Sequence, residues 1–199
     1  MKIFGLTGGL GMGKSAAAQL LGARGVAVLD TDDLARRVVE PGQPAFEEVL
    51  QVFGPEFVAP DGRLRRSELA RRVFADPAAR KQLEAILHPP IRVLWQAQAA
   101  LWRNESRPQG VIVIPLLFET GAEAEFDATL CVACSAATQR RRLLARGWTL
   151  AEIEQRLSAQ WPIEEKMGRA DYVVWTEGGL DLHAAQLARI GLGEAGAGR

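Results

Sequence analysis

The sequence predicts an α/β fold in which helices cover both faces of a parallel sheet. Five short apolar runs have the length and composition of buried strands, at residues 3–6, 26–29, 111–114, 130–134 and 172–175. Strands that are apolar along their whole length are typical of parallel sheets, because both of their faces are buried. Long helical patterns separate the runs in the middle of the chain, as such a sheet requires.

About eighty residues separate the second and third runs, far more than one crossover helix needs, so we expect an inserted helical subdomain. Its expected helices cover residues 45–53, 66–74, 77–87 and 91–103. Turns are predicted at Glu40-Pro41-Gly42 and Pro60-Asp61-Gly62. Asp76 followed by Pro77 is a typical start of a helix.

The remaining segments complete the predicted organisation. A core would comprise residues 1–35, 105–138 and 165–190, and residues 36–104 would form the inserted substrate domain. Residues 139–164 contain two helical patterns, 139–146 and 150–160, and are expected to act as a lid. Residues 191–199 are rich in Gly and Ala, which predicts a flexible tail.

The charge balance argues against several classes of partner. Lys plus Arg and Asp plus Glu both number 24, so no overall positive field attracts nucleic acid or an anionic membrane. The longest apolar stretch, residues 111–118, is too short to cross a bilayer, and no cleavable apolar segment begins the chain. We therefore expect a soluble, cytoplasmic protein, and a monomer.

A phosphate-binding loop directly follows the first apolar run. Residues 8–15, GGLGMGKS, fit the pattern Gly, four residues, Gly, Lys, then Ser or Thr. The glycines let backbone N–H groups point inward around an anion, Lys14 would reach the β and γ phosphates, and Ser15 would ligate Mg²⁺. The alternative is a Gly-rich turn with a chance Lys-Ser, but strand, loop and helix in this order favour an ATP or GTP user.

Carboxylates follow the second apolar run, at the edge of the sheet where ligands of open parallel folds bind. If the strand continued through Asp30-Thr31-Asp32-Asp33, Asp30 and Asp32 would share one side. One could then orient Mg²⁺ waters while the other accepts a proton. The structural alternative is that Asp32 or Asp33 caps the next helix. The two roles are compatible, and we expect at least one Asp to be functional.

Other candidate residues carry weaker signals. Arg142 and Arg146 are four apart, which would place both on one helix face over a triphosphate or, alternatively, on a solvated surface. His88, before Pro89, is more consistent with a structural role. Glu119 is expected at the carboxyl end of the third strand, where it could contact the acceptor or metal-bound water.

The two cysteines, Cys131 and Cys134, form a C-x-x-C pair that could indicate redox or metal chemistry. Residues three apart in a strand point to opposite faces, and no second pair completes a tetrahedral zinc site. We therefore expect both thiols to be structural.

Taken together, these segments resemble the dephospho-coenzyme A kinase family over most of the chain. The loop alone belongs to a large superfamily, but the order of the other motifs is more specific. They are Asp30-Thr31-Asp32, Val38-Val39-Glu40-Pro41-Gly42, His88-Pro89, Pro115-Leu116-Leu117-Phe118-Glu119, Gln139 with Arg142 and Arg146, Gln160, and Ala170-Asp171. The resemblance implies a P-loop core, a helical CoA-binding domain and a lid. It also implies phosphorylation of the 3′-hydroxyl of dephospho-CoA by Mg²⁺-ATP, giving CoA and ADP.

The resemblance implies roles for individual residues. Asp32 would be the general base, Lys14 and Arg142 would also be catalytic, and Ser15 would bind the metal. ATP contacts are implied for Gly9, Gly11, Met12, Gly13, Lys14, Ser15, Ala16, Arg142 and Arg146. Contacts with dephospho-CoA are implied for Asp32, Arg36, Arg66, His88, Leu116, Leu117 and Glu119.

The chain departs from the family pattern at four positions. Ala16 stands where Thr is usual, Ala133 where Asp is common, Ala136 where Pro is common, and Thr176 where Asn is usual. Lys14 and Ser15 are retained, so these departures do not threaten catalysis. We assign no adenine contact to Thr176.

Two other functions stay open at this point. A kinase for a nucleoside monophosphate or small alcohol would share the loop, but the long, locally basic insertion favours a larger acceptor. A nucleotide-binding switch would need neither an acceptor base nor a lid that carries arginines.

Overall fold

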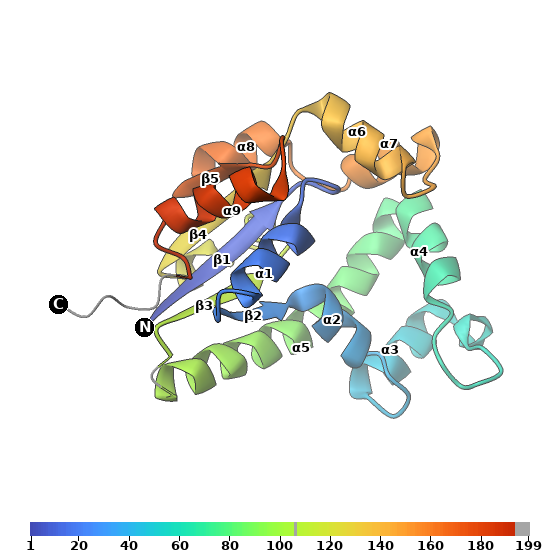
Figure 1. The fold of residues 1–199 in the computed structure, drawn as a ribbon. Coiled ribbons are helices and arrows are strands. Elements are labelled where there is room, and N and C mark those ends of the chain that lie inside the picture. Colours follow the sequence, from blue (N-terminus) through green and yellow to red (C-terminus); the bar gives the residue numbers. More distant parts are fainter. Residues whose placement is uncertain (106, 194–199) are drawn as a thin grey trace. The chain divides into compact units, whose positions relative to one another are not determined.

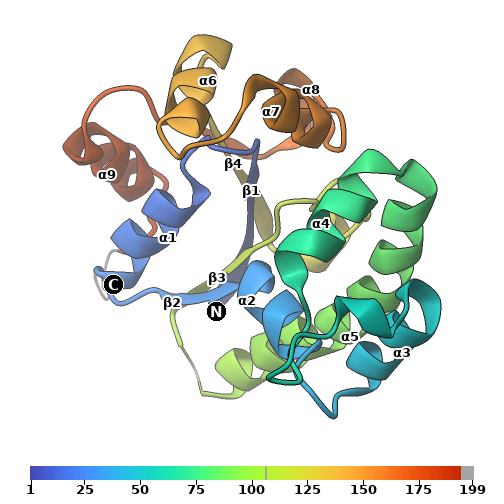
Figure 2. The same ribbon diagram turned by 90° about the vertical axis from the view of Figure 1, so that its right-hand side faces the viewer.

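The computed structural model describes residues 1–105 and 107–193. The chain forms two compact units (Figures 1 and 2), one made of Met1–Asp30 with Ala99–Arg199 and the other of Thr31–Gln98. The first unit contains the sheet and the second is helical, so each is described in turn.

All five strands of the sheet are parallel, which confirms the predicted fold class. They are β1 (Lys2–Gly8), β2 (Ala27–Asp30), β3 (Gln109–Val113), β4 (Ala128–Ala133) and β5 (Tyr172–Trp175). Their order is β2-β3-β1-β4-β5, so β1, which leads into the glycine-rich loop, lies in the centre. Parallel strands end at one edge, and that edge carries both the loop after Gly8 and the carboxylate of Asp30.

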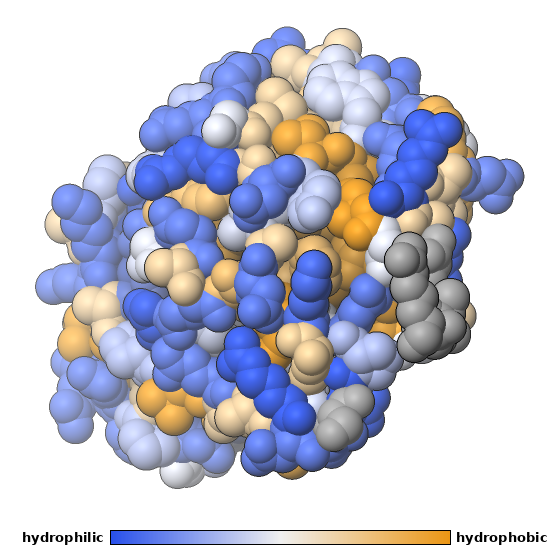
Figure 3. Space-filling view, turned by 90° about the vertical axis from the view of Figure 1, so that its left-hand side faces the viewer, coloured by the Kyte–Doolittle hydropathy of each residue, from blue (hydrophilic) through white to orange (hydrophobic). Residues whose placement is uncertain are grey.

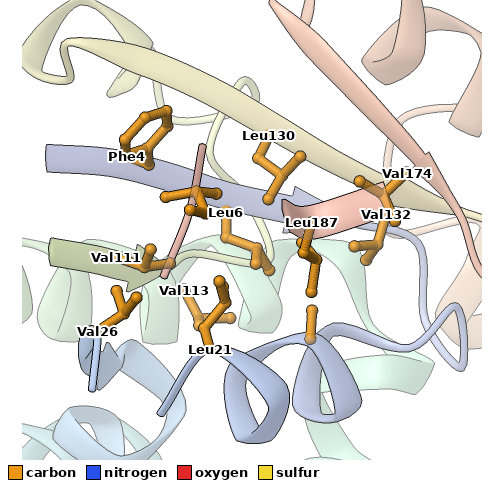
Figure 4. Close-up of a cluster of buried hydrophobic side chains, with 12 residues drawn as sticks. Phe4, Leu6, Leu21, Val26, Val111, Val113, Leu130, Val132, Val174 and Leu187 are labelled. Atoms are coloured by element: carbon orange, nitrogen blue, oxygen red, sulfur yellow. The ribbon is translucent and has the colours of Figure 1, made fainter. Parts of the chain in front are cut away.

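One face of the sheet is covered by α1 (Lys14–Gly22) and α9 (Leu180–Arg189). Leu6, Leu130 and Leu187, which have no solvent exposure, belong to a cluster of buried apolar side chains (Figure 4). Each buried leucine contributes about 1.5–3 kcal/mol to folding, so this layer holds β1 rigidly beneath the loop that follows it.

Alternate residues of the same strands face the other side of the sheet, where α8 (Ile163–Arg169) contacts β4 and β1. The packing here is close at Gly5, because a Cβ atom would lie 2.8 Å from the ring of Phe126. A short 3₁₀ turn, Glu123–Glu125, precedes that ring. The three central strands, β1, β3 and β4, therefore have the predicted buried pattern. The expectation of buried strands was wrong at the edges, because β2 is half-buried and β5 is mostly exposed.

The second unit contains α2 (Thr31–Arg37), α3 (Pro44–Phe53), the 3₁₀ turn Pro55–Phe57, α4 (Arg66–Ala75) and most of α5 (Pro77–Asn104). Its core includes Val49, Leu69 and Val73. Asp76 Oδ1 accepts the backbone N–H groups of Ala78 at 2.9 Å and Ala79 at 3.3 Å, so the predicted helix start is confirmed.

The prediction of separate helices over 77–87 and 91–103 was wrong. The structure has one helix, α5, with Pro89 and Pro90 in its interior. Each interior proline removes a helix hydrogen bond and costs about 3 kcal/mol. Ile86 before the prolines and Ile91 after them pack in the same core cluster, and this tertiary packing opposes the local tendency to break.

The segment after β4 forms α6 (Ala136–Leu144) and α7 (Leu150–Leu157). Ser135 caps α6 by accepting the Thr138 N–H, and Thr149 and Glu152 form a reciprocal capping box on α7. Two caps within fifteen residues define short, separate helices.

The expected flexible tail begins with ordered residues. Leu192 is fully buried in the core. Gln109 Nε2 donates a hydrogen bond to Gly191 O at 2.5 Å, and the Gly193 N–H donates to Gln109 Oε1 at 2.9 Å. Residues 194–199 lie outside the described part of the chain. In the part that is described, no helix has the length and apolarity needed to cross a membrane.

Strand β5 forms one edge of the sheet and carries exposed apolar side chains. Tyr172, Val173 and Trp175 are 40%, 43% and 40% exposed. Figure 3, which faces the left-hand side of Figure 1, shows hydrophobic atoms gathered in a patch bordered by hydrophilic side chains. On the edge itself, Trp175 N–H donates to Gln186 Oε1 at 2.9 Å and Gln186 Nε2 donates to Trp175 O at 2.8 Å.

Candidate active site

The glycine-rich loop between β1 and α1 has a backbone that only glycine adopts easily. Gly8, Gly11 and Gly13 have φ of 150°, 71° and 100°. A Cβ atom on Gly8 would also lie 2.3 Å from Val132 O, closer than two such atoms can approach. The loop therefore requires glycine for both conformation and space, which distinguishes it from a chance turn.

Lys14 and Ser15 open α1 at the mouth of this loop. Lys14 Nζ donates to Gly8 O at 2.9 Å and Gly9 O at 3.0 Å, so its ammonium group lies across the loop. Ser15 is exposed, and the first turn of α1 has no acidic residue. A helix N-terminus with a lysine beside it favours binding of a phosphate group.

The residues present fit Mg²⁺ only together with a bound nucleotide. In residues 1–105 and 107–193, no group of three His, Cys, Asp or Glu side chains could hold a metal ion. Mg²⁺ needs no such cage, because one protein oxygen, phosphate oxygens and waters complete its octahedron. The exposed hydroxyl of Ser15 at the start of α1 is an oxygen of that kind.

Arg142 of α6 reaches back to the loop through Thr176. Its guanidinium donates to Thr176 Oγ1 at 2.9 Å and Thr176 O at 2.5 Å. The same hydroxyl donates to Met12 O at 2.9 Å. Thr176 thus joins this arginine to the phosphate-binding loop.

Arg146 does not share a helical face with Arg142, so that prediction was wrong. Helix α6 ends at Leu144, and Gly147 with φ of 82° turns the chain. Arg146 is exposed in this turn. Gly147 was the signal in the sequence that α6 ends before Arg146, because helices commonly end at a glycine in the left-handed conformation.

Glu119 lies beyond β3 and is held by a buried lysine that the sequence analysis missed. Lys166 Nζ is 2.6 Å from Glu119 Oε1 and 2.8 Å from Pro115 O, and its side chain has no solvent exposure. Glu119 Oε1 also accepts the Trp161 N–H at 3.0 Å. Glu119 Oε2 is buried and has no hydrogen-bond partner among residues 1–105 and 107–193. The carboxylate therefore keeps one oxygen that could accept a further hydrogen bond.

The buried thiols are not reactive groups. Burial raises the pKa of Cys131 to about 11, against the opposing effects of nearby Lys166 and Lys14. Burial also raises the pKa of Cys134, which lies one residue beyond β4. A thiol with a raised pKa forms little of the nucleophilic thiolate, which agrees with the expectation that both cysteines are structural.

The predicted acceptor residues Asp32, Arg36, Arg66 and His88 all belong to the helical unit. Arg66 Nη2 donates to Arg36 O at 2.8 Å, which brings these two arginines together. Arg36 also pairs with Asp33 at 2.5 Å. His88 lies in the interior of α5, where burial lowers the pKa of its imidazole, opposed by Glu84. The structure thus groups basic residues within this unit.

The expectations for Asp32 require correction in two respects. Strand β2 ends at Asp30, so it does not continue through Asp32. Helix α2 begins at Thr31, so Asp32 and Asp33 occupy its first turn and neither is a cap. Both carboxylates are exposed, and their negative charge complements the positive end of the helix.

Comparison with known proteins identifies the group to which this site belongs. Residues 2–181 match the family model described as dephospho-CoA kinase. The chain belongs to the dephospho-CoA kinase family. It uses ATP, and its activity is dephospho-CoA kinase activity, the final step of coenzyme A biosynthesis. This assignment sets aside the nucleoside monophosphate kinase and the non-catalytic switch.

Individual relatives agree with the family match. A dephospho-CoA kinase of Anaeromyxobacter dehalogenans is 46% identical over 191 residues, covering 96% of this chain and 90% of the relative. The crystal structure of TT1252 from Thermus thermophilus is 40% identical, with a TM-score of 0.82 over 98% of both chains. A dephospho-CoA kinase from Campylobacter jejuni is 22% identical and shares the fold, with a TM-score of 0.69 over 94% of both chains.

Proposed function

We propose that the sheet-containing unit of this kinase binds Mg²⁺-ATP and that the helical unit, including Arg36, Arg66 and His88, binds dephospho-CoA. One observation carries the proposal: a glycine-dependent loop at the carboxyl end of the central strand opens onto α1 with Lys14 and Ser15. The arginine pair of the helical unit supports the acceptor assignment, because dephospho-CoA carries phosphate groups that guanidinium groups bind well.

On the nucleotide side, Lys14 would hold the β and γ phosphates and Ser15 would supply a ligand to Mg²⁺, which neutralises charge on the phosphates when bound. Backbone N–H groups of residues 9–16 would line the phosphate site. Arg142 would stabilise charge that develops during transfer, with Arg146 in support. The contacts of Arg142 with Thr176 place its guanidinium beside the loop, as this role requires.

On the acceptor side, Asp32 would accept the proton of the 3′-hydroxyl as its oxygen attacks the γ-phosphorus. Asp32 is exposed and follows the end of β2 by two residues, at the edge where ligands of parallel sheets bind. Glu119, with Leu116 and Leu117 before it, would contact the acceptor or metal-bound water through Oε2, which has no hydrogen-bond partner among the described residues. A cytoplasmic location and a monomeric state complete the proposal.

The test is to identify the products formed from Mg²⁺-ATP and a panel of acceptors by mass spectrometry. We expect a gain of one phosphate on dephospho-CoA and none on nucleoside monophosphates, shikimate or gluconate. Lys14→Ala should abolish transfer while the protein still folds, because Lys14 acts on phosphates at the loop. Transfer to another acceptor in preference to dephospho-CoA would contradict the acceptor assignment, and full turnover by Lys14→Ala would contradict the loop assignment.

A further inference from the structure

Two glutamines from opposite ends of the segment that carries α6 and α7 hold a single residue of the phosphate-binding loop. Gln139 Nε2 donates to Leu10 O at 2.7 Å, and Leu10 N–H donates to Gln160 Oε1 at 3.1 Å. Gln139 lies in α6 and is 6% exposed, while Gln160 follows α7. A backbone N–H only donates and a carbonyl only accepts, so each amide has one possible orientation.

These two bonds orient two successive peptide units. In a trans peptide the C=O and N–H groups point in opposite directions. The Gly9–Leu10 unit directs its N–H to Gln160 and its carbonyl to Lys14 Nζ, 3.0 Å away. The Leu10–Gly11 unit directs its carbonyl to Gln139, so the Gly11 N–H points away from α6. Within the described residues, that N–H donates no hydrogen bond to the protein.

We propose that Gln139 and Gln160 are positioning residues for ATP, which fix the Leu10 peptide units so that the Gly11 N–H donates to a bound phosphate. The proposal rests on the proposed function, in which this loop holds the nucleotide. Gly11 has φ of 71°, and a glycine accepts either orientation of the preceding peptide at little cost. The loop sequence alone does not select one orientation, so the two side chains supply the selection. They also tie both ends of the segment carrying Arg142 to the loop.

The sharpest test compares two substitutions that add the same charge beside the same residue. Gln139→Glu replaces the donor by a carboxylate, which repels Leu10 O and attracts the Gly11 N–H, so the peptide should flip. Gln160→Glu adds an equal charge but keeps an oxygen that accepts the Leu10 N–H. We expect the Kd for ATP, measured by calorimetry without acceptor, to be at least about tenfold higher for Gln139→Glu than for Gln160→Glu.

Further measurements separate positioning from general stability. Gln139→Met and Gln160→Met each remove one hydrogen bond to Leu10 without adding charge, and each should raise the Kd for ATP about fivefold. Gln160 is only half-buried, so the Gln160 variants remain informative if the Gln139 variants do not fold. The KM for dephospho-CoA should not change. Of the two Glu variants, only Gln139→Glu should move the Gly11 amide ¹⁵N shift away from that of the parent. Equal Kd values for the two Glu variants, or unchanged Kd values for the Met variants, would overturn the proposal. If ATP binding follows the expected pattern but dephospho-CoA is not phosphorylated, only the proposed function fails.

Discussion

At the scale of single residues, charge placement decides what each carboxylate can do. Asp32 is exposed in the first turn of α2, where its charge favours the helix by about 0.3–1 kcal/mol. Glu119 forms an ion pair with the fully buried Lys166, and its other oxygen has no partner within the described part of the chain. The first carboxylate has solvent access for proton transfer, whereas the second is held in a fixed position.

We predict that Asp32→Asn lowers kcat by at least about 10²-fold while both substrates still bind, because an amide cannot accept the proton of the acceptor hydroxyl. Steady-state kinetics with both KM values would measure this. Asp30→Asn is the matched control, since a carboxylate that orients metal-bound water should show a defect that depends on Mg²⁺ concentration. If Asp30→Asn is inactive and Asp32→Asn is nearly normal, the two roles are reversed.

We predict that Lys166→Met lowers the free energy of unfolding by about 3 kcal/mol, because it leaves the Glu119 carboxylate buried without its cation. Adding Glu119→Gln should recover at least about 1 kcal/mol, since the amide oxygen still accepts the Trp161 N–H without a buried charge. Urea unfolding of the parent, both single variants and the double variant gives the coupling energy. Strictly additive losses would show that the pair does not interact.

At the scale of helices and strands, the local patterns predicted the sheet and the loop because strands, turns and helix starts depend on near neighbours. The single helix α5 was missed, because packing of Ile86 and Ile91 in one cluster opposes the effect of two interior prolines. Lys166 follows two glutamates and has the sequence signal of a surface residue. Its partner Glu119 is distant in sequence, so only the tertiary structure reveals the ion pair.

The start of α6 depends on a carboxylate from the connection after β5, which predicts a pH effect. Glu177 accepts hydrogen bonds from Ser135 N–H at 3.1 Å, from the Ser135 hydroxyl, and from the Trp175 indole at 3.1 Å. Hydrogen bonds from Ser135 and Thr138 lower the pKa of Glu177 from its ordinary 4.5 to about 2. Because the folded pKa is the lower one, this stabilisation is complete above pH 4.5 and disappears as the pH falls towards 2.

We therefore predict that Glu177→Gln melts at a lower temperature than the parent at pH 7, and that the difference narrows between pH 4.5 and 2. Calorimetric melting of both proteins across this range is the measurement. Glu48→Gln, which changes an exposed carboxylate of α3 in the other compact unit, is the control for net charge. A difference that stays constant down to pH 2 would mean that the carboxylate charge is not what stabilises α6.

At the scale of the whole molecule, the exposed edge of the sheet bears on assembly. An open strand edge pairs readily with another strand, and β5 presents exposed Tyr172, Val173 and Trp175 there. Gln186 occupies the place of a neighbouring strand by bonding both the N–H and the C=O of Trp175. This side-chain pairing blocks the C-terminal end of the edge strand, and it agrees with the proposed monomer.

We predict that the parent chain is a monomer and that Gln186→Ala self-associates, because the substitution frees both backbone groups of Trp175 beside an apolar surface. Light scattering coupled to size exclusion over a range of concentrations would show a mass that rises with concentration for this variant alone. Gln19→Ala makes the same chemical change on an exposed site of α1, so it should behave like the parent. Infrared spectra should show added strand pairing in associated Gln186→Ala. A parent that is already dimeric, or a variant that stays monomeric at every concentration, would mean that Gln186 does not guard this edge against a second strand.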